Sequence, residues 1–279
     1  MSKPLNADEV SIHKDVALSK INNLLNTYIN DPKPKHLKKA NLISYWLENY
    51  ISYIQGEEIF EPSRLKRYER GDIIKVNFGF NVGSEYGGLH YAIVLDKANA
   101  RNSPVITVIP LTSYTDGDSI HSNDVFLGNE LYLKLQLKIR GLKQNLFTER
   151  QQTETLQSSI QTLLNMLEPL LTEVASTDDV NKIIMNDEQE FAFTQAIDQL
   201  KSIQAHEESI QKQESLLNKA SLEIAKMKDG SVALPNQITT ISKQRIYDPK
   251  SSYDVLSGVK LSPDGLDKLN KGLKNLFFN

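Results

Sequence analysis

The chain has 279 residues, which is enough to bury a sizeable core and to form one large domain or two ordinary ones. An apolar fraction of 39% and a charged fraction of 24% are typical of a folded soluble protein rather than a disordered or membrane one. The absence of Cys excludes disulfides, thiolate nucleophiles and Cys-ligated metal centres. The formal net charge of −3 gives no overall footprint for nucleic acid, so such binding needs a local basic patch or a partner subunit.

The N-terminal residues are polar, and no segment approaches the roughly 18 consecutive apolar residues that a membrane-spanning helix needs. Neither export nor membrane spanning is indicated. A chain without Cys also suits a reducing compartment. We therefore expect a cytoplasmic protein.

Two helices are predicted at the N-terminus. Asn6 and Glu9 have the spacing of a capping box, and apolar residues then recur at helical intervals over residues 7–29. Prolines within residues 31–35 interrupt this pattern, and a second amphipathic pattern runs over residues 37–54. The N-terminal region is therefore expected to form a helical hairpin.

After Arg70 the pattern changes to short strands. They are predicted at Ile73–Phe80, Tyr91–Leu95, Val105–Leu111, Val125–Leu127, Ser231–Leu234 and Ile238–Ser242. Their short length and close spacing favour a small, strongly curved antiparallel barrel over a parallel sheet with crossover helices.

Residues 130–228 separate the two groups of strands and have strong helical periodicity. Leu and Ile recur near heptad spacing in two arms, which predicts an antiparallel coiled-coil hairpin. Arms of roughly 40 residues would be about 60 Å long, and Pro169 is expected to kink the outgoing arm. The sequence Ser262-Pro-Asp then predicts the start of a C-terminal helix.

The expected fold class is α+β, with four segments in the chain. They are an N-terminal helical extension (1–64), the first part of the barrel (65–129), the inserted helical hairpin (130–228), and the second part of the barrel with the C-terminal helix (229–279).

Three consecutive segments resemble the first half of MazF/PemK-family toxins in the order and spacing of their motifs. They are Arg70–Phe78, Gly83–Leu95 and Val105–Ser113. After the insertion, Gly230–Arg245 resembles the family's next element, and the last predicted helix resembles its terminal helix. The resemblance implies an SH3-like barrel that is usually a homodimer and is neutralised by an antitoxin occupying the RNA groove.

The resemblance also implies the activity, which is cleavage of single-stranded RNA without a metal or other cofactor. The 2′-hydroxyl attacks the adjacent phosphate, leaving a cyclic phosphate and a free 5′-hydroxyl. Such a reaction needs a base, an acid, and hydrogen-bond donors directed at the charge that builds on phosphorus.

Three catalytic candidates follow from the resemblance. His90 stands where the family has its main catalytic Arg. A His exchanges protons near neutral pH, whereas an Arg stays protonated and stabilises charge, so the replacement either preserves catalysis by other means or abolishes it. Thr112 matches the second catalytic position, and Glu85 matches a loop acid that could act as base or orient His90.

The expected RNA contacts are Ser84, Ser113, Gln237 and Arg245, of which Arg245 is the best suited to bind phosphate. The catalytic candidates also have structural interpretations. A His after Gly-Gly is often a strand-start residue bonded to backbone, and Thr is common at strand ends for packing reasons.

No metal or nucleotide site is expected. The acidic loop around Asp116 and Asp124 has no calcium or zinc spacing, and the Gly-rich loop lacks the Lys-Thr or Lys-Ser of a phosphate-binding Walker loop.

Three functional hypotheses remain. The first is a toxin-like endoribonuclease whose hairpin and N-terminal helices add partner binding, dimerisation or self-inhibition. The second is a catalytically silent module that recognises nucleic acid or protein with its barrel and assembles through its coiled coil. The third, a structural coiled-coil adaptor, leaves the matches at Gly83–Leu95 and Pro110–Ser113 unexplained.

Overall fold

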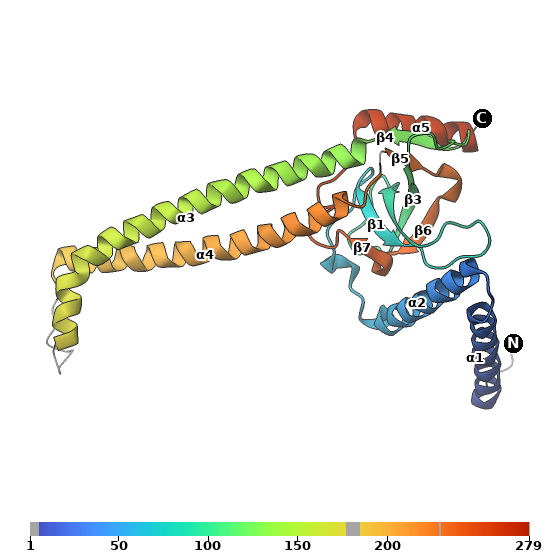
Figure 1. Cartoon of the computed structure of the whole chain (residues 1–279), viewed down its shortest axis with the longest axis horizontal. Coiled ribbons are helices and arrows are strands. Elements are labelled where there is room, and N and C mark those ends of the chain that lie inside the picture. Colours follow the sequence, from blue (N-terminus) through green and yellow to red (C-terminus); the bar gives the residue numbers. More distant parts are fainter. Residues whose placement is uncertain (1–5, 177–184, 229, 279) are drawn as a thin grey trace.

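The computed structural model describes residues 6–176, 185–228 and 230–278. Residues 1–5 of the predicted N-terminal extension and residues 177–184 of the predicted hairpin lie outside the described residues. A small curved sheet occupies one end of the molecule, two long helices extend from it, and two shorter helices lie beside it (Figure 1).

The N-terminal helices are α1 (Ala7–Ile29) and α2 (Pro34–Gly56), as predicted. The Asn6 side chain caps α1 by accepting a hydrogen bond from the Asp8 amide at 3.0 Å. No residue of α1 is buried, whereas α2 buries Ala40 and Ile43. Helix α2 is therefore packed more closely against the rest of the protein than α1 is.

Seven strands form one antiparallel sheet. They are β1 (Ile73–Asn77), β2 (Leu89–Val94), β3 (Val105–Tyr114), β4 (Val125–Gly128), β5 (Gly230–Ala233), β6 (Thr239–Ser242) and β7 (Ile246–Asp248). The strand order is β4-β5-β3-β2-β1-β7, and β6 also pairs with β3. Only the 3₁₀ turn η5 (Lys243–Arg245) separates β6 on β3 from β7 on β1, so this segment closes the curved sheet. The predicted α+β fold is confirmed.

The strands that depart most from the prediction are β1, β3 and β7, and β3 extends to Tyr114 rather than ending at Leu111. Strand β1 ends at Asn77 rather than Phe80, because Gly79 adopts a φ of 84° and its amide donates to the Asn77 side chain at 3.0 Å. Strand β7 was not predicted, since three residues are too few to show an alternating pattern.

Strands β2 and β3 separate part-way along their length. Their last paired residues are Ala92 and Pro110, and the Pro has no N–H with which to continue the ladder. Beyond this point β3 pairs on its other edge with β5, over residues 111–114. The ends of β2 and β3 therefore leave a gap in which polar side chains from both strands can meet.

The inserted segment consists of α3 (Glu130–Ser176) and α4 (Asp187–Ile224), which run beside each other in opposite directions. Their buried residues include Leu146, Ile160, Leu167 and Leu170 on α3, and Ala192, Ala196 and Ile203 on α4. Figure 1 shows α3 bending near its distal end, as expected for a helix with Pro169 inside it.

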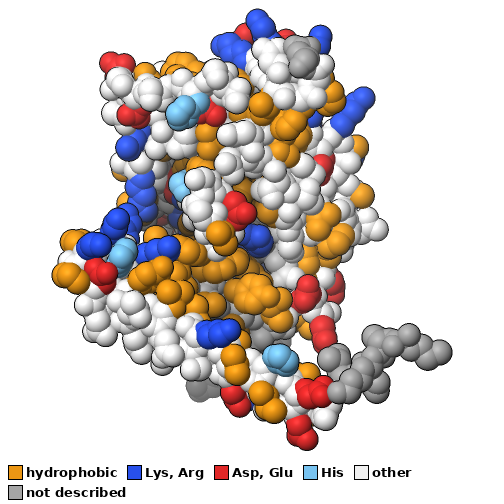
Figure 2. Space-filling model, turned by 90° about the vertical axis from the view of Figure 1, so that its right-hand side faces the viewer, with side chains coloured by type: hydrophobic (Ala, Val, Ile, Leu, Met, Phe, Trp, Pro, Cys, Tyr) orange, Lys and Arg blue, Asp and Glu red, His pale blue; other side chains and the backbone are white. Residues whose placement is uncertain are grey.

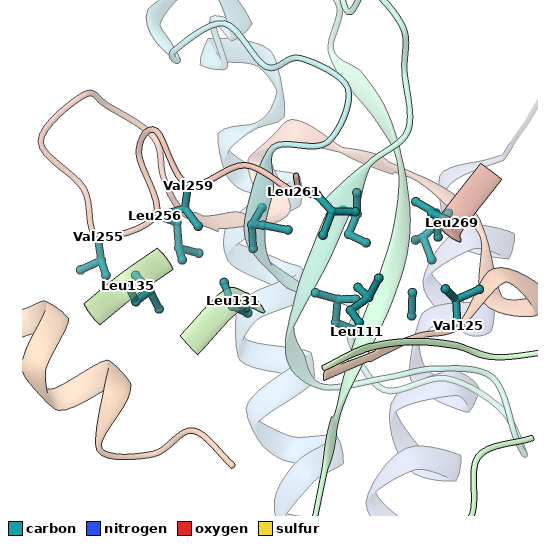
Figure 3. Close-up of a cluster of buried hydrophobic side chains, with 14 of the residues drawn as sticks. Leu111, Val125, Leu131, Leu135, Val255, Leu256, Val259, Leu261 and Leu269 are labelled. Carbon is teal, nitrogen blue, oxygen red and sulfur yellow. The ribbon is translucent and has the colours of Figure 1, made fainter. Parts of the chain in front are cut away.

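The start of α3 belongs to the core of the sheet. Leu131 and Leu135 pack in one cluster with Leu111, Val125, Leu256 and Leu269, the last on α5 (Pro263–Phe277) (Figure 3). The Lys138 ammonium donates to the carbonyls of Asp254, Val255 and Ser257 at 2.7–3.0 Å. These contacts hold the base of the hairpin firmly against the sheet.

Candidate active site

A cavity of about 180 Å³ lies where β2 and β3 separate. His90 lines it from β2, and Thr112 and Ser113 line it from β3. Continuing the register of Ala92 with Pro110 would set His90 opposite Thr112. The structure therefore brings together three of the residues predicted for the site.

Tyr86 lies beside this cavity, in contact with His90. Its ring packs on the His90 imidazole with centroids 4.7 Å apart, and its hydroxyl donates to the Leu111 carbonyl at 2.7 Å. Burial raises the pKa of Tyr86 to about 12, although a side-chain hydrogen bond with Thr112 opposes the change. Tyr86 therefore contacts both sides of the gap and remains a neutral hydrogen-bond donor at pH 7.

The His90 imidazole is half-buried and tends to be uncharged. Burial lowers its pKa, a hydrogen bond with the Gly87 backbone opposes this effect, and the nearby positive charge of Lys75 adds to it. A neutral imidazole at pH 7 can accept a proton, which is what a general base must do.

Sequence reasoning missed a cluster of charged and phenolic groups at the same cavity. Lys75 on β1 and Tyr91 on β2 are cross-strand partners, and both contact the Glu223 carboxylate at the end of α4. Lys75 could have been picked out from the sequence, because it is a charged residue between the apolar strand residues Ile74 and Val76. No sequence pattern points to Glu223, because its position depends on where the long hairpin returns to the sheet.

Glu85 and Gln237 line a second cavity, of about 380 Å³. The Glu85 carboxylate accepts from the Val82 amide at 3.1 Å, within its own loop. Gln237 accepts from the Tyr86 amide at 3.2 Å and donates to the Ser84 carbonyl at 3.4 Å. Glu85 and Gln237 are therefore placed to hold the Gly-rich loop, and the structure does not bring Glu85 to the cavity that contains His90.

Arg245 also lines the second cavity, but its contacts are with the protein. Its Nε donates to the Asn77 carbonyl at 2.8 Å, and its guanidinium lies 5.2 Å from the Trp46 ring centroid. Burial lowers its pKa. Arg245 thus connects α2 to the end of β1.

Residues 69–159 match a family model described as PemK-like, MazF-like toxin of type II toxin-antitoxin system. Over this segment the chain is similar to toxins of that family. The match covers about a third of the chain, and it includes Ser84, Glu85, His90, Thr112 and Ser113. Gln237 and Arg245 lie beyond it, in the 3₁₀ turns η4 (Pro235–Gln237) and η5, before and after β6.

A comparison with curated proteins found no match. Among the described residues, no group of three or more His, Asp or Glu side chains is arranged to hold a metal ion. None of the helices described here is long and apolar enough to cross a membrane.

Proposed function

We propose that the toxin-like domain is a metal-independent endoribonuclease that cleaves single-stranded RNA at the cavity between β2 and β3. The observation that carries this proposal is the meeting of a neutral imidazole, His90, with the Thr112 hydroxyl in an open cavity that Lys75 also lines. A proton acceptor, a hydroxyl donor and a positive charge in one place suit attack of a 2′-hydroxyl on a phosphate.

In this proposal His90 removes the proton from the 2′-hydroxyl. Thr112 and Ser113 donate to the nonbridging phosphate oxygens, which gain negative charge as the new bond forms. The bond between phosphorus and the 5′-oxygen breaks as the new bond forms, and the departing oxygen takes a proton from water. The products are a 2′,3′-cyclic phosphate and a 5′-hydroxyl. Ser84 and Gln237 are proposed to contact RNA at the edge of the Gly-rich loop, while Glu85 keeps that loop in shape.

The replacement of the family's Arg by His90 changes how charge is stabilised. A single imidazole cannot make the bidentate phosphate contact of a guanidinium. The Lys75 ammonium, which lines the same cavity, supplies a positive charge. Arg245 can contribute to the electrostatic field at the RNA surface, but its contacts with Asn77 and Trp46 make positioning of α2 its first role.

The test is incubation of the purified full-length protein with mixed-sequence single-stranded RNA in EDTA, followed by mapping of the product ends. We expect wild-type protein to leave cyclic-phosphate and 5′-hydroxyl ends. His90→Ala and Thr112→Val should lower the cleavage rate by about 10²-fold or more. Intact RNA in both wild-type and variant reactions, with folded protein and no inhibitor bound, would argue against the proposal.

A second candidate is a catalytically silent RNA-binding module. It is favoured by the hydrogen bond of the His90 ring with the Gly87 backbone, because that bond gives the imidazole a structural partner. Under this hypothesis His90→Ala would change RNA affinity at most, and no cleavage would be seen with any form of the protein.

We also propose that the protein is a cytoplasmic homodimer whose antitoxin partner covers the RNA site. Helix α1 buries no residue yet carries apolar side chains such as Ile12, Val16 and Leu18. Figure 2 shows hydrophobic side chains gathered over the lower part of the face that includes the N-terminal helices. Light scattering should give twice the mass of one chain for the wild-type protein. The double variant Ile12→Asp, Val16→Asp should have the mass of a single chain.

A further inference from the structure

Glu223 holds a specific position beside the candidate catalytic residues. Its Oε1 accepts hydrogen bonds from the Lys75 ammonium and, at 2.5 Å, from the Tyr91 hydroxyl. The Glu223 side chain is 18% exposed and that of Lys75 is 16% exposed, so solvent screens their interaction only partly. One carboxylate oxygen thus occupies a position with two donors directed at it.

The charge around this position is predominantly positive. Lys75, Lys226 and Lys228 line the cavity together with His90, and Glu223 is the one acidic side chain among the described residues that line it. Although burial opposes ionisation, the bonds from Lys75 and Tyr91 keep the pKa of Glu223 below its usual value. At neutral pH the cavity therefore holds one bound carboxylate among cationic groups.

We propose that Lys75 and Tyr91 form a subsite for an RNA backbone phosphate beside His90, and that Glu223 occupies this subsite as a competing anion. A nonbridging phosphate oxygen accepts hydrogen bonds from an ammonium and a phenol in the same way as the Glu223 carboxylate does. The inference rests on the proposed ribonuclease function and extends its site to residues on β1 and α4.

The arrangement has a consequence for RNA entry. Glu223 lies in the last turn of α4, one residue before the helix ends at Ile224. RNA must displace this carboxylate before its phosphate can reach Lys75. The carboxylate and the RNA therefore compete for the same two donors, and the apparent RNA affinity includes the free energy needed to separate Glu223 from them.

A purely structural role for Glu223, as an anchor of the hairpin on the sheet, predicts a different result. Removing an anchor would lower thermal stability and leave RNA affinity unchanged or weaker. Removing a competitor would strengthen RNA binding even if stability fell. The sign of the affinity change therefore distinguishes the two roles.

The experiment measures fluorescence anisotropy of a labelled 2′-O-methyl RNA dodecamer, which cannot be cleaved because its 2′-oxygens are blocked. Full-length wild type is compared with Glu223→Gln and with Glu208→Gln. The second variant is a matched charge change on the same helix, at an exposed residue that pairs with Lys212. We expect Glu223→Gln to tighten binding on the order of tenfold. Glu208→Gln should stay within about twofold of wild type, as expected for screened long-range charge.

A second pair of variants tests the lysines that line the cavity. Lys75→Met in the Glu223→Gln background should weaken binding and lower the slope of log affinity against log salt by about one, as expected for loss of one phosphate contact. Lys226→Gln, at an exposed residue, should weaken binding without affecting folding. It keeps the proposal testable if the Lys75 variant does not fold.

Equal affinities for Glu223→Gln and Glu208→Gln, or unchanged affinity in both lysine variants, would overturn the subsite. A cleavage assay run in parallel separates this outcome from failure of the proposed function. Cleavage without any effect of Glu223→Gln removes the subsite but retains the ribonuclease. Tighter binding without cleavage supports the subsite and removes the ribonuclease.

Discussion

The Tyr86 ring packs on the His90 imidazole at a centroid distance of 4.7 Å, and the Tyr86 hydroxyl donates to the Leu111 carbonyl at 2.7 Å. A single side chain therefore spans the gap where β2 and β3 separate. Its hydroxyl restores a contact with β3 beyond the end of the ladder, and its ring limits the access of water to the imidazole. Both effects can be measured separately.

Tyr86→Phe should lower the free energy of unfolding by about 1 kcal/mol, because it removes one hydrogen bond and keeps the ring. Cleavage should fall only modestly, since the ring still packs on His90. Urea denaturation measures the change in the free energy of unfolding, and initial rates measure the change in cleavage. A cleavage loss as large as that of His90→Ala would mean that the Tyr86 hydroxyl acts in the reaction itself.

The His90 pKa should lie below its ordinary value of 6.5, since burial and Lys75 both disfavour the imidazolium. Between the folded-state pKa and 6.5 the unfolded chain binds more protons than the folded one, so His90 makes stability rise with pH across this window. Its stabilising contribution is present above pH 6.5 and is lost as the pH falls through the folded-state pKa. NMR titration of the imidazole measures the value directly.

Lys75→Met should raise that pKa toward 6.5, because it removes the nearby positive charge. The matched control is Lys260→Met, at a lysine that pairs with Glu69. It should leave the titration unchanged. No change in the Lys75 variant would indicate that burial alone sets the pKa.

Arg245→Lys should lower the free energy of unfolding by about 1–2 kcal/mol, even though the charge is retained. A lysine cannot reproduce the guanidinium contact with Trp46 together with the Nε bond to the Asn77 carbonyl. Arg140→Lys, at an exposed residue of α3, should change stability by less than about 0.5 kcal/mol. Normal stability with reduced RNA affinity would instead support a direct phosphate contact.

Gly79→Ala should destabilise the protein more than Gly83→Ala does. Both glycines have positive φ, at 84° and 62°, so both substitutions carry a backbone cost of about 1–2 kcal/mol. An added Cβ at Gly79 would lie 2.7 Å from the Trp46 ring, whereas at Gly83 it would meet nothing within 4 Å. The difference between the melting temperatures of the two variants measures the contribution of the contact between α2 and Gly79. Equal melting temperatures would contradict that contact.

The helices could be predicted closely because their ends carry local signals. Asn6 caps α1, and Ser262 caps α5 by accepting from the Gly265 amide at 3.0 Å. Strand β1 was predicted too long because the backbone turn at Gly79 interrupts an apolar run that continues in the sequence.

The candidate site could be predicted only in part. His90 and Thr112 follow from motifs within one stretch of chain, and the separation of β2 from β3 brings them together. The contact of Lys75 with Glu223 joins residues 148 positions apart. It depends on the lengths of two helices and on how the hairpin is fixed to the core, which no local pattern encodes. The placement of Glu85 in a different cavity from His90 likewise depends on how its loop folds.

The most direct test of the proposed reaction uses RNA with a single 2′-deoxy nucleotide at a mapped cleavage position, incubated in EDTA with wild type and with Glu223→Gln. If the 2′-hydroxyl is the nucleophile, cleavage at that position should disappear with both proteins, while cleavage at other positions continues. Cleavage that persists at the deoxy position, or that leaves a 5′-phosphate, would contradict the account.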